Sequence, residues 1–224
     1  MDNFRERTGQ TIGKAISCQQ SAVSFQFGKK QDMEIGNTLY ITDRKDWRAW
    51  LKKHHKTETE VWLVYYRKET GQPRISYNDA VEEALCFGWI DSIVRTIDKE
   101  RFAQRFSVRK KTSSLSQMNR ERIRTLIRQK KLTKAGMAAI AHVFDPEKDK
   151  PADFVIPNDI LQPLQANKQA WEYFQKLPED YRRIRIVFID SRRRHGEQQF
   201  QTSLKNFIKM TAKNKRIGFV KEMK

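Results

Sequence analysis

The chain has 224 residues, of which 38% are hydrophobic and 32% charged, and its formal net charge is +18. This length accommodates one large core, or one core with a smaller helical domain beside it. No apolar run is long enough to span a bilayer, and the two cysteines, Cys18 and Cys86, offer little material for a disulfide framework or a cysteine-rich metal site. We therefore expect a protein of a reducing compartment, the cytoplasm, without a membrane span.

The positive charge is concentrated in two stretches of the sequence. Residues 95–134 contain 14 basic and 3 acidic side chains, and residues 181–224 contain 13 basic and 3 acidic ones, so that the rest of the chain is slightly acidic. Such asymmetry creates a local positive potential that attracts phosphates, nucleic acid or other anions. A basic surface that only keeps the protein in solution is the alternative.

Residues 1–32 mix Gly, Gln, Ser and Lys without helical or strand periodicity. They lack the continuous apolar segment of a secretory signal peptide. We predict that they are a disordered tail, or that Met33 is the true start of the protein.

Residues 33–144 alternate between strand and helix patterns, which predicts an α+β domain. Leu39–Ile41 is a short strand candidate, and Thr42 or Asp43 is placed to cap the helix that follows. The predicted inner side of this helix comprises Trp47, Trp50 and Leu51.

A second strand and helix follow in the same domain. Val61–Tyr66 is rich in branched and aromatic residues, as strands are. Ser76 and Asp79 form a variant of the capping box ahead of an apolar helical stripe, and Gly88 is placed to end that helix. The stripe consists of Ala80, Val81, Ala84 and Leu85.

A hairpin and two helices complete the predicted domain. Ile93–Ile97 and Phe102–Val108 read as two strands joined by a charged turn. Ser114 or Ser116 then caps a helix, and Thr133 caps a shorter one that reaches about Phe144. The first of these helices should turn Met118, Ile123, Leu126 and Ile127 inward and Arg120, Arg122, Arg124 and Arg128 mostly outward.

Residues 145–157 contain three prolines and alternating charges, which is typical of a linker. Beyond them, apolar spacing predicts helices over about 161–177, 179–193 and 196–213, with Tyr181, Ile184 and Phe188 among the inward residues. We therefore predict an α+β domain over 33–144, with a small, mainly antiparallel sheet flanked by helices. A linker over 145–157 and a helical domain over 158–224 follow it.

Several motifs resemble the YdeI/OmpD-associated family. The stretch Glu83–Asp91 (EALCFGWID) carries the resemblance most specifically, followed by Ile97-Asp98 and Arg105-Phe106, and the similarity extends over about residues 35–217. The segment 192–199 departs from the family's pattern. The resemblance implies a protein of bacteriocin protection or outer-membrane-porin association, and so a role in stress or envelope-peptide resistance, but no defined reaction.

Cys86 lies within the apolar stripe and is expected to be a small buried residue rather than a nucleophile. The four histidines fit no metal-ligand spacing, and the glycines form no phosphate-binding loop, so we predict neither a metal nor a cofactor. Without a catalytic signature, binding is favoured over catalysis.

One cluster of polar residues around the predicted hairpin is a candidate ligand site, in which arginines bind an anion and an indole stacks on it. Its members are Trp89, Asp91, Arg105, Arg109, Lys110, Ser113 and Asn119. The ligand would be either nucleic-acid backbone or a small anionic molecule. The alternative is a structural junction, in which Asp91 pairs with an arginine and Trp89 belongs to the core.

Overall fold

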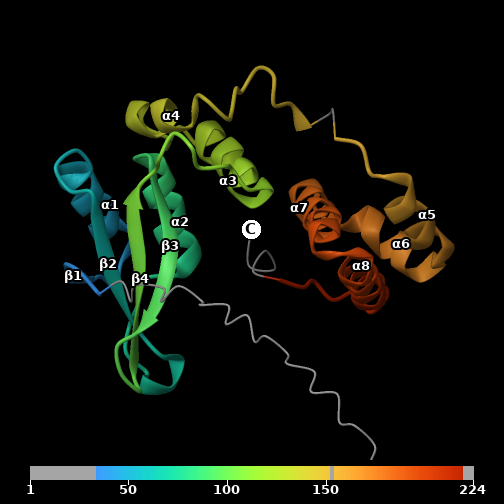
Figure 1. Ribbon diagram of the computed structural model, residues 1–224, viewed down its shortest axis with the longest axis horizontal. Coiled ribbons are helices and arrows are strands. Elements are labelled where there is room, and N and C mark those ends of the chain that lie inside the picture. Colours follow the sequence, from blue (N-terminus) through green and yellow to red (C-terminus); the bar gives the residue numbers. More distant parts are fainter. Residues whose placement is uncertain (1–33, 152–153, 219–224) are drawn as a thin grey trace, which may run out of the picture. The chain divides into compact units, whose positions relative to one another are not determined.

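The computed structural model describes residues 34–151 and 154–218, and its first part is built on a four-stranded sheet (Figure 1). The strands are β1 (Thr38–Tyr40), β2 (Glu60–Tyr66), β3 (Trp89–Thr96) and β4 (Arg101–Val108), in the order β1-β2-β4-β3. β1 is parallel to β2, and the other two pairings are antiparallel. The predicted α+β class with a mainly antiparallel sheet is confirmed.

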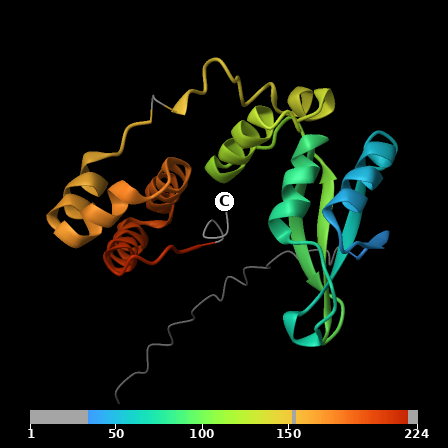
Figure 2. The same ribbon diagram turned by 180° about the vertical axis from the view of Figure 1, so that it is seen from behind.

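Helices α1 (Arg44–His54) and α2 (Tyr77–Cys86) lie against the same face of this sheet (Figure 2). Side chains alternate between the two faces of a strand, so Leu63 and Tyr65 on β2 share the face of Phe106 on β4. They join Trp47 and Leu51 of α1 in one hydrophobic cluster. The prediction that the inner side of α1 belongs to the core is confirmed.

The predicted caps of these two helices are also present. The Asp43 side chain accepts a hydrogen bond from the backbone N–H of Lys45, and the Ser76 hydroxyl accepts one from that of Asp79. The Ser76 hydroxyl also donates to the Asp79 carboxylate at 2.7 Å. Each cap satisfies an N–H group that the helix itself leaves without a partner.

β3 begins at Trp89, four residues before the predicted start. Gly88 has a φ of +78°, and a Cβ there would lie 2.7 Å from Cβ of Ala139, so a glycine is required for the chain to turn directly from α2 into the strand. The register of β3 against β4 shifts between Asp91 and Val94. The prediction missed the first half of the strand because this bulge interrupts the alternation of apolar and polar residues on which the prediction relied.

Helices α3 (Gln117–Arg128) and α4 (Lys134–Ile140) pack onto the same cluster through Ile123, Leu126 and Ile140. Ser116 and Thr133 cap them. Arg122 does not point outward as predicted. It is 2% exposed and donates hydrogen bonds to the side-chain oxygens of Asn119 and Asn78 at 2.9 and 2.6 Å.

The second part of the chain is helical, with α5 (Asn158–Ala166), α6 (Lys168–Lys176), α7 (Glu179–Ser191), a 3-10 turn η3 (Arg192–His195) and α8 (Glu197–Ala212). The single helix predicted over 161–177 is wrong. Asn167 has an extended ψ of 93°, and its side chain accepts a hydrogen bond from the N–H of Ala170. Since asparagine caps helices well, it ends α5 and begins α6 within an otherwise continuous apolar pattern.

The buried residues form two separate hydrophobic clusters. The first runs from Ile41 to Phe144 and the second from Ile160 to Phe207, and Phe154 and Ile156 of the predicted linker pack against the second. Met118 of α3 packs against the second cluster. Phe188, which the periodicity placed inside, is 43% exposed.

An ion-pair network joins α3 to α7. Glu121 is 3% exposed and accepts hydrogen bonds from Arg183 at 2.7 and 3.0 Å, from Arg124 at 2.7 Å and from Gln117 at 2.7 Å. Within the described ranges, no helix has both the length and the apolar character that a bilayer crossing requires. The predicted tail over 1–32 lies outside the residues that the structure describes.

Candidate functional site

Strands β3 and β4 extend beyond the N-terminal end of α2, so that the helices leave one end of the sheet's inner face uncovered (Figure 1). A cavity of about 680 Å³ lies there, and we name it the sheet pocket. It is lined by residues from β2, the 3-10 turn η1 (Lys68–Thr70), the start of α2, β3 and β4. These are Tyr65, Lys68, Arg74, Ile75, Ser76, Tyr77, Asp91, Ser92, Val94, Phe102 and Gln104.

The apolar lining of the sheet pocket is aromatic. Tyr65 and Phe102 occupy opposite positions on β2 and β4, and their rings stack with centroids 5.2 Å apart and planes 7° apart. Val94, which is 54% exposed, and the buried Ile75 extend this lining. The combination offers a flat apolar surface to a ring-shaped or otherwise planar ligand.

One buried polar group of the pocket, the Tyr65 hydroxyl, lacks a partner among the described residues. Tyr65 is 3% exposed, and its hydroxyl makes no hydrogen bond to the described residues. Gln104, which is 5% exposed, is a second polar side chain in the lining. An unpaired buried polar group costs about 1 to 3 kcal/mol. A ligand with matching donors and acceptors recovers that energy.

The opposite wall carries a tyrosine and carboxylate pair. The Tyr77 hydroxyl donates to Oδ2 of Asp91 at 2.8 Å. Burial raises the pKa of Tyr65, and burial together with the charge of Asp91 raises the pKa of Tyr77. Both hydroxyls therefore stay protonated at neutral pH and serve as hydrogen-bonding groups rather than as bases.

Two cations stand beside the pocket. Lys68 is exposed, and the half-buried Arg74 donates to the backbone carbonyl of Tyr66 at 3.1 Å. A ligand in the pocket would thus meet positive charge on the side of Lys68 and Arg74 and negative charge at Asp91.

The seven residues predicted as a ligand site do not converge on one surface. Asp91 alone lines the sheet pocket. Trp89 is fully buried, and its indole N–H donates to the carbonyl of His55 at 3.3 Å, so it presents no stacking face to a ligand. Arg105 points to the other face of the sheet, where it pairs with Glu60, because it is adjacent to the inward-facing Phe106.

The remaining predicted residues belong to the loop after β4 and to α3. Arg109 is 6% exposed and donates to the carbonyls of Ser113 and Ser114, and burial lowers the pKa of its guanidinium. Asn119 bonds to Arg122, whereas Lys110 is exposed. The structural alternative holds for Trp89, which belongs to the core. It does not hold for Asp91, which bonds to Tyr77 rather than to an arginine.

Sequence reasoning missed Tyr65, Tyr77 and Gln104. Tyr65 read as an ordinary strand aromatic, and Tyr77 was given no role. Gln104 carried a signal, because it is a polar residue at an inward position between Phe102 and Phe106. The predicted burial of Cys86 is confirmed, and burial with the nearby charge of Glu83 raises the pKa of its thiol to about 11, which keeps it unreactive.

Two family models match separate stretches of the chain. Residues 39–139, which contain the sheet, α1 to α3 and the EALCFGWID motif, match a model described as a domain of unknown function (DUF8412). Residues 153–216 match a model described as "Bacteriocin-protection, YdeI or OmpD-Associated". No significant match was found among curated proteins or among solved structures. The predicted resemblance to the YdeI/OmpD-associated family is thus confirmed for the helical stretch 153–216, whereas the sheet-bearing stretch 39–139 matches a different model.

Proposed function

We propose that this protein binds a small organic molecule in the sheet pocket. The observation that carries the proposal is the buried Tyr65 hydroxyl, since it lines a cavity of ligand size and has no partner among the described residues. Gln104 lines the same cavity. The lining favours a planar apolar body over Phe102 and an anionic group near Lys68 and Arg74. Binding, not catalysis, is the proposed activity.

A pair of valine variants tests the pocket. Val94→Trp places an indole at the pocket, whereas Val108→Trp places one at the far end of the sheet, at a residue of similar exposure (54% against 43%) that does not line the pocket. With 1-anilinonaphthalene-8-sulfonate as a fluorescent probe of planar, anionic character, we expect at least a tenfold loss of affinity for Val94→Trp and none for Val108→Trp. Equal affinities for the two variants contradict the proposal.

Tyr65→Phe separates binding from stability. Removal of a buried hydroxyl that has no partner should leave the thermal unfolding midpoint unchanged or raised. A ligand that hydrogen-bonds to this hydroxyl should bind about tenfold more weakly, which corresponds to roughly 1.4 kcal/mol. A lowered midpoint would mean that the hydroxyl serves the fold instead.

We further propose that ligand binding serves resistance to bacteriocins or other envelope stress from within the cytoplasm. The description of the family matched by residues 153–216 supports this role. Direct capture of cationic peptides is disfavoured because a chain of net charge +18 repels them. Bacteria lacking the gene should survive a bacteriocin less well, and Val108→Trp should restore survival where Val94→Trp fails.

A further inference from the structure

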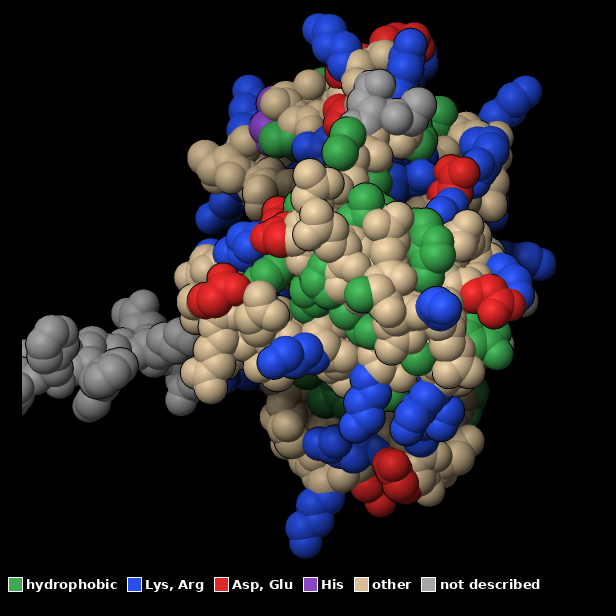
Figure 3. Space-filling model, turned by 90° about the vertical axis from the view of Figure 1, so that its right-hand side faces the viewer, with side chains coloured by type: hydrophobic (Ala, Val, Ile, Leu, Met, Phe, Trp, Pro, Cys, Tyr) green, Lys and Arg blue, Asp and Glu red, His purple; other side chains and the backbone are tan. Residues whose placement is uncertain are grey.

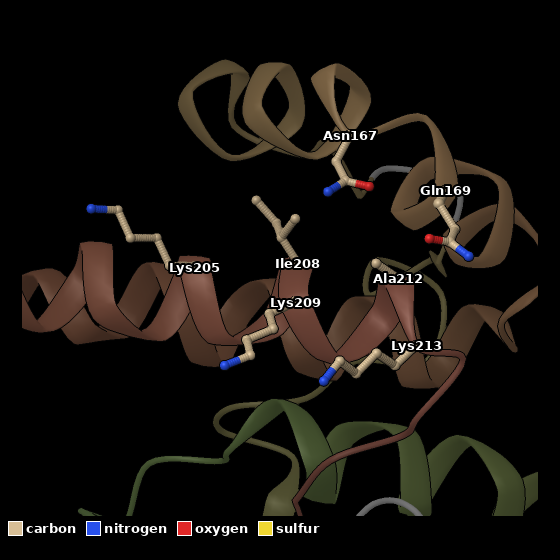
Figure 4. A pocket seen from close by; sticks show the side chains of 7 residues that line it. All are labelled: Asn167, Gln169, Lys205, Ile208, Lys209, Ala212 and Lys213. Carbon is tan, nitrogen blue, oxygen red and sulfur yellow. The ribbon is translucent and has the colours of Figure 1, made fainter.

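We propose that helix α8 binds the phosphate backbone of nucleic acid along a row of three lysines, Lys205, Lys209 and Lys213. Lys205 and Lys209 lie four residues apart in α8, about 6 Å along its axis, and Lys213 is the C-cap residue that follows the helix. In Figure 4, Lys209 and Lys213 lie side by side, and Lys205 lies nearer the start of the helix and points away from them. All three are exposed.

These lysines differ from many arginines of the chain in having no acidic partner. Arg44, Arg48, Arg105, Arg120, Arg124, Arg183 and Arg193 each form an ion pair with a carboxylate. Lys205, Lys209 and Lys213 form no ion pair within the described part of the chain, and the like charges of Lys205 and Lys209, four residues apart, disfavour a helix. Their repulsion is relieved when a polyanion binds along the row.

The space beside the row suits a backbone of phosphates and sugars. It is a shallow hollow of about 420 Å³, in which Ile208 and Ala212 form the apolar part (Figure 4). Asn167 and Gln169, at the start of α6, contribute amides to the same hollow. The oxygen of Asn167 already accepts the N–H of Ala170, which leaves its amide nitrogen to donate. The lysines and amides at the hollow therefore offer hydrogen-bond donors to phosphate oxygens, beside a mainly apolar lining.

The surroundings favour nucleic acid over a lipid surface. An interfacial helix buries exposed apolar residues in the bilayer, but Phe200, Leu204 and Phe207 of α8 are buried in the second hydrophobic cluster. The wider surface supports the attraction of an anion, since Figure 3 shows more Lys and Arg than Asp and Glu side chains on the face that it draws. Backbone contacts by lysines carry no sequence preference.

A triple substitution with a matched control tests the proposal on the full chain. Lys205→Gln, Lys209→Gln and Lys213→Gln are combined, and the control combines Lys52→Gln, Lys53→Gln and Lys56→Gln, which removes the same charge from exposed lysines around the end of α1. Fluorescence anisotropy measures binding to a random-sequence oligonucleotide, single-stranded and duplex, between about 50 and 200 mM salt. Circular dichroism checks that both variants fold.

For the unaltered chain, affinity should fall steeply with salt. The α8 variant should bind at least tenfold more weakly at the lower salt concentration, and its salt slope on single strands should be smaller by about 2, as expected for three lost phosphate contacts. The control should retain its slope. Equal losses of affinity in both triple variants would overturn the proposal. So would a loss seen only in a third variant, which combines Lys110→Gln with Lys111→Gln. Binding to anionic phosphatidylserine vesicles without binding to oligonucleotides would overturn it as well.

Discussion

Gly136 lies within α4 where that helix meets the carboxyl end of α2. The Thr133 hydroxyl and backbone N–H both donate to the carbonyl of Cys86, at 2.5 and 3.1 Å, and hold the start of α4 against α2. A Cβ on Gly136 would lie only 2.8 Å from the carbonyl oxygen of Leu85. Backbone atoms cannot swing aside, so this position requires a glycine for close approach rather than for a special φ.

Gly136→Ala is therefore expected to destabilise the protein although it improves helix propensity. Propensity alone would stabilise α4 by about 1 kcal/mol. Overpacking against the end of α2 should cost about 1 to 3 kcal/mol, so that the net change in the free energy of unfolding is a loss. Urea unfolding measures the difference in the free energy of unfolding between Gly136→Ala and the unaltered protein. As a control, Ala138→Gly at an exposed position of the same helix measures the effect of helix propensity without a change in packing. A more stable Gly136→Ala variant would show that the two helices do not meet so closely.

Residues differ in how far the sequence reveals their roles. The caps Asp43, Ser76 and Ser116 were predictable because a cap acts on the backbone two or three residues away. Arg122 was not, since its burial depends on Asn78, which is distant in sequence. The Tyr65 hydroxyl became notable only when the fold had buried it without a partner.

At the scale of elements, α3 and α7 are held together by Glu121. Burial by itself would raise the pKa of this carboxyl, but the hydrogen bond from Arg183 and the charges of Arg124 and Arg183 outweigh burial and lower the pKa below its ordinary value. Because the folded-state pKa lies below the unfolded one, the ionised carboxylate stabilises the fold above about pH 4.3. That stability is lost as the pH falls through the folded-state pKa.

Glu121→Gln should accordingly lower the free energy of unfolding at pH 7 by about 1.5 to 3 kcal/mol. The difference from the unaltered protein should shrink as the pH falls through the lowered folded-state pKa, where the native carboxyl becomes protonated as well. Denaturant unfolding at several pH values measures this trend. Glu172→Gln, which removes an exposed pair with Lys176, should change nothing measurable. A difference that stays constant with pH would assign the effect of Glu121→Gln to packing.

Most elements were predictable, and the exceptions have local causes. Apolar spacing identified α1, α2, α3, α7 and α8. Apolar spacing predicted α5 and α6 as one helix, because the apolar stripe continues across Asn167. The backbone at Asn167 is extended, so the helix ends there and a new one begins. The prediction also missed the first half of β3, where the shift between Asp91 and Val94 breaks the alternation of side chains.

For the whole molecule, the two hydrophobic clusters raise the question of whether the chain unfolds in one step. Phe207 is fully buried in the second cluster and meets Phe174 edge to face, with ring centroids 6.1 Å apart. Leu51 is fully buried in the first. The Glu121 network and Met118 connect the two.

Phe207→Ala and Leu51→Ala should each act mainly on their own cluster. Truncation of a buried phenylalanine costs about 3 to 5 kcal/mol and of a buried leucine about 2 to 5. Hydrogen exchange should accelerate chiefly in α5 to α8 for Phe207→Ala and chiefly in the sheet with α1 and α2 for Leu51→Ala. If both variants accelerated exchange everywhere alike, the predicted domain boundary over 145–157 would not separate two folding units.

The sequence by itself determined the class of fold, the capped helices, the change of character near residues 145–157 and the resemblance of the helical stretch to a known family. All of these follow from patterns within a few tens of residues. Only the tertiary structure decided where the sheet pocket lies, because it joins residues from β2, α2, β3 and β4. The positive charges were also misleading in the sequence. Arg105 and Arg109 were predicted to bind a ligand, but in the fold Arg105 is paired and Arg109 is buried. Whether a polar group is free depends on neighbours that only folding brings to it.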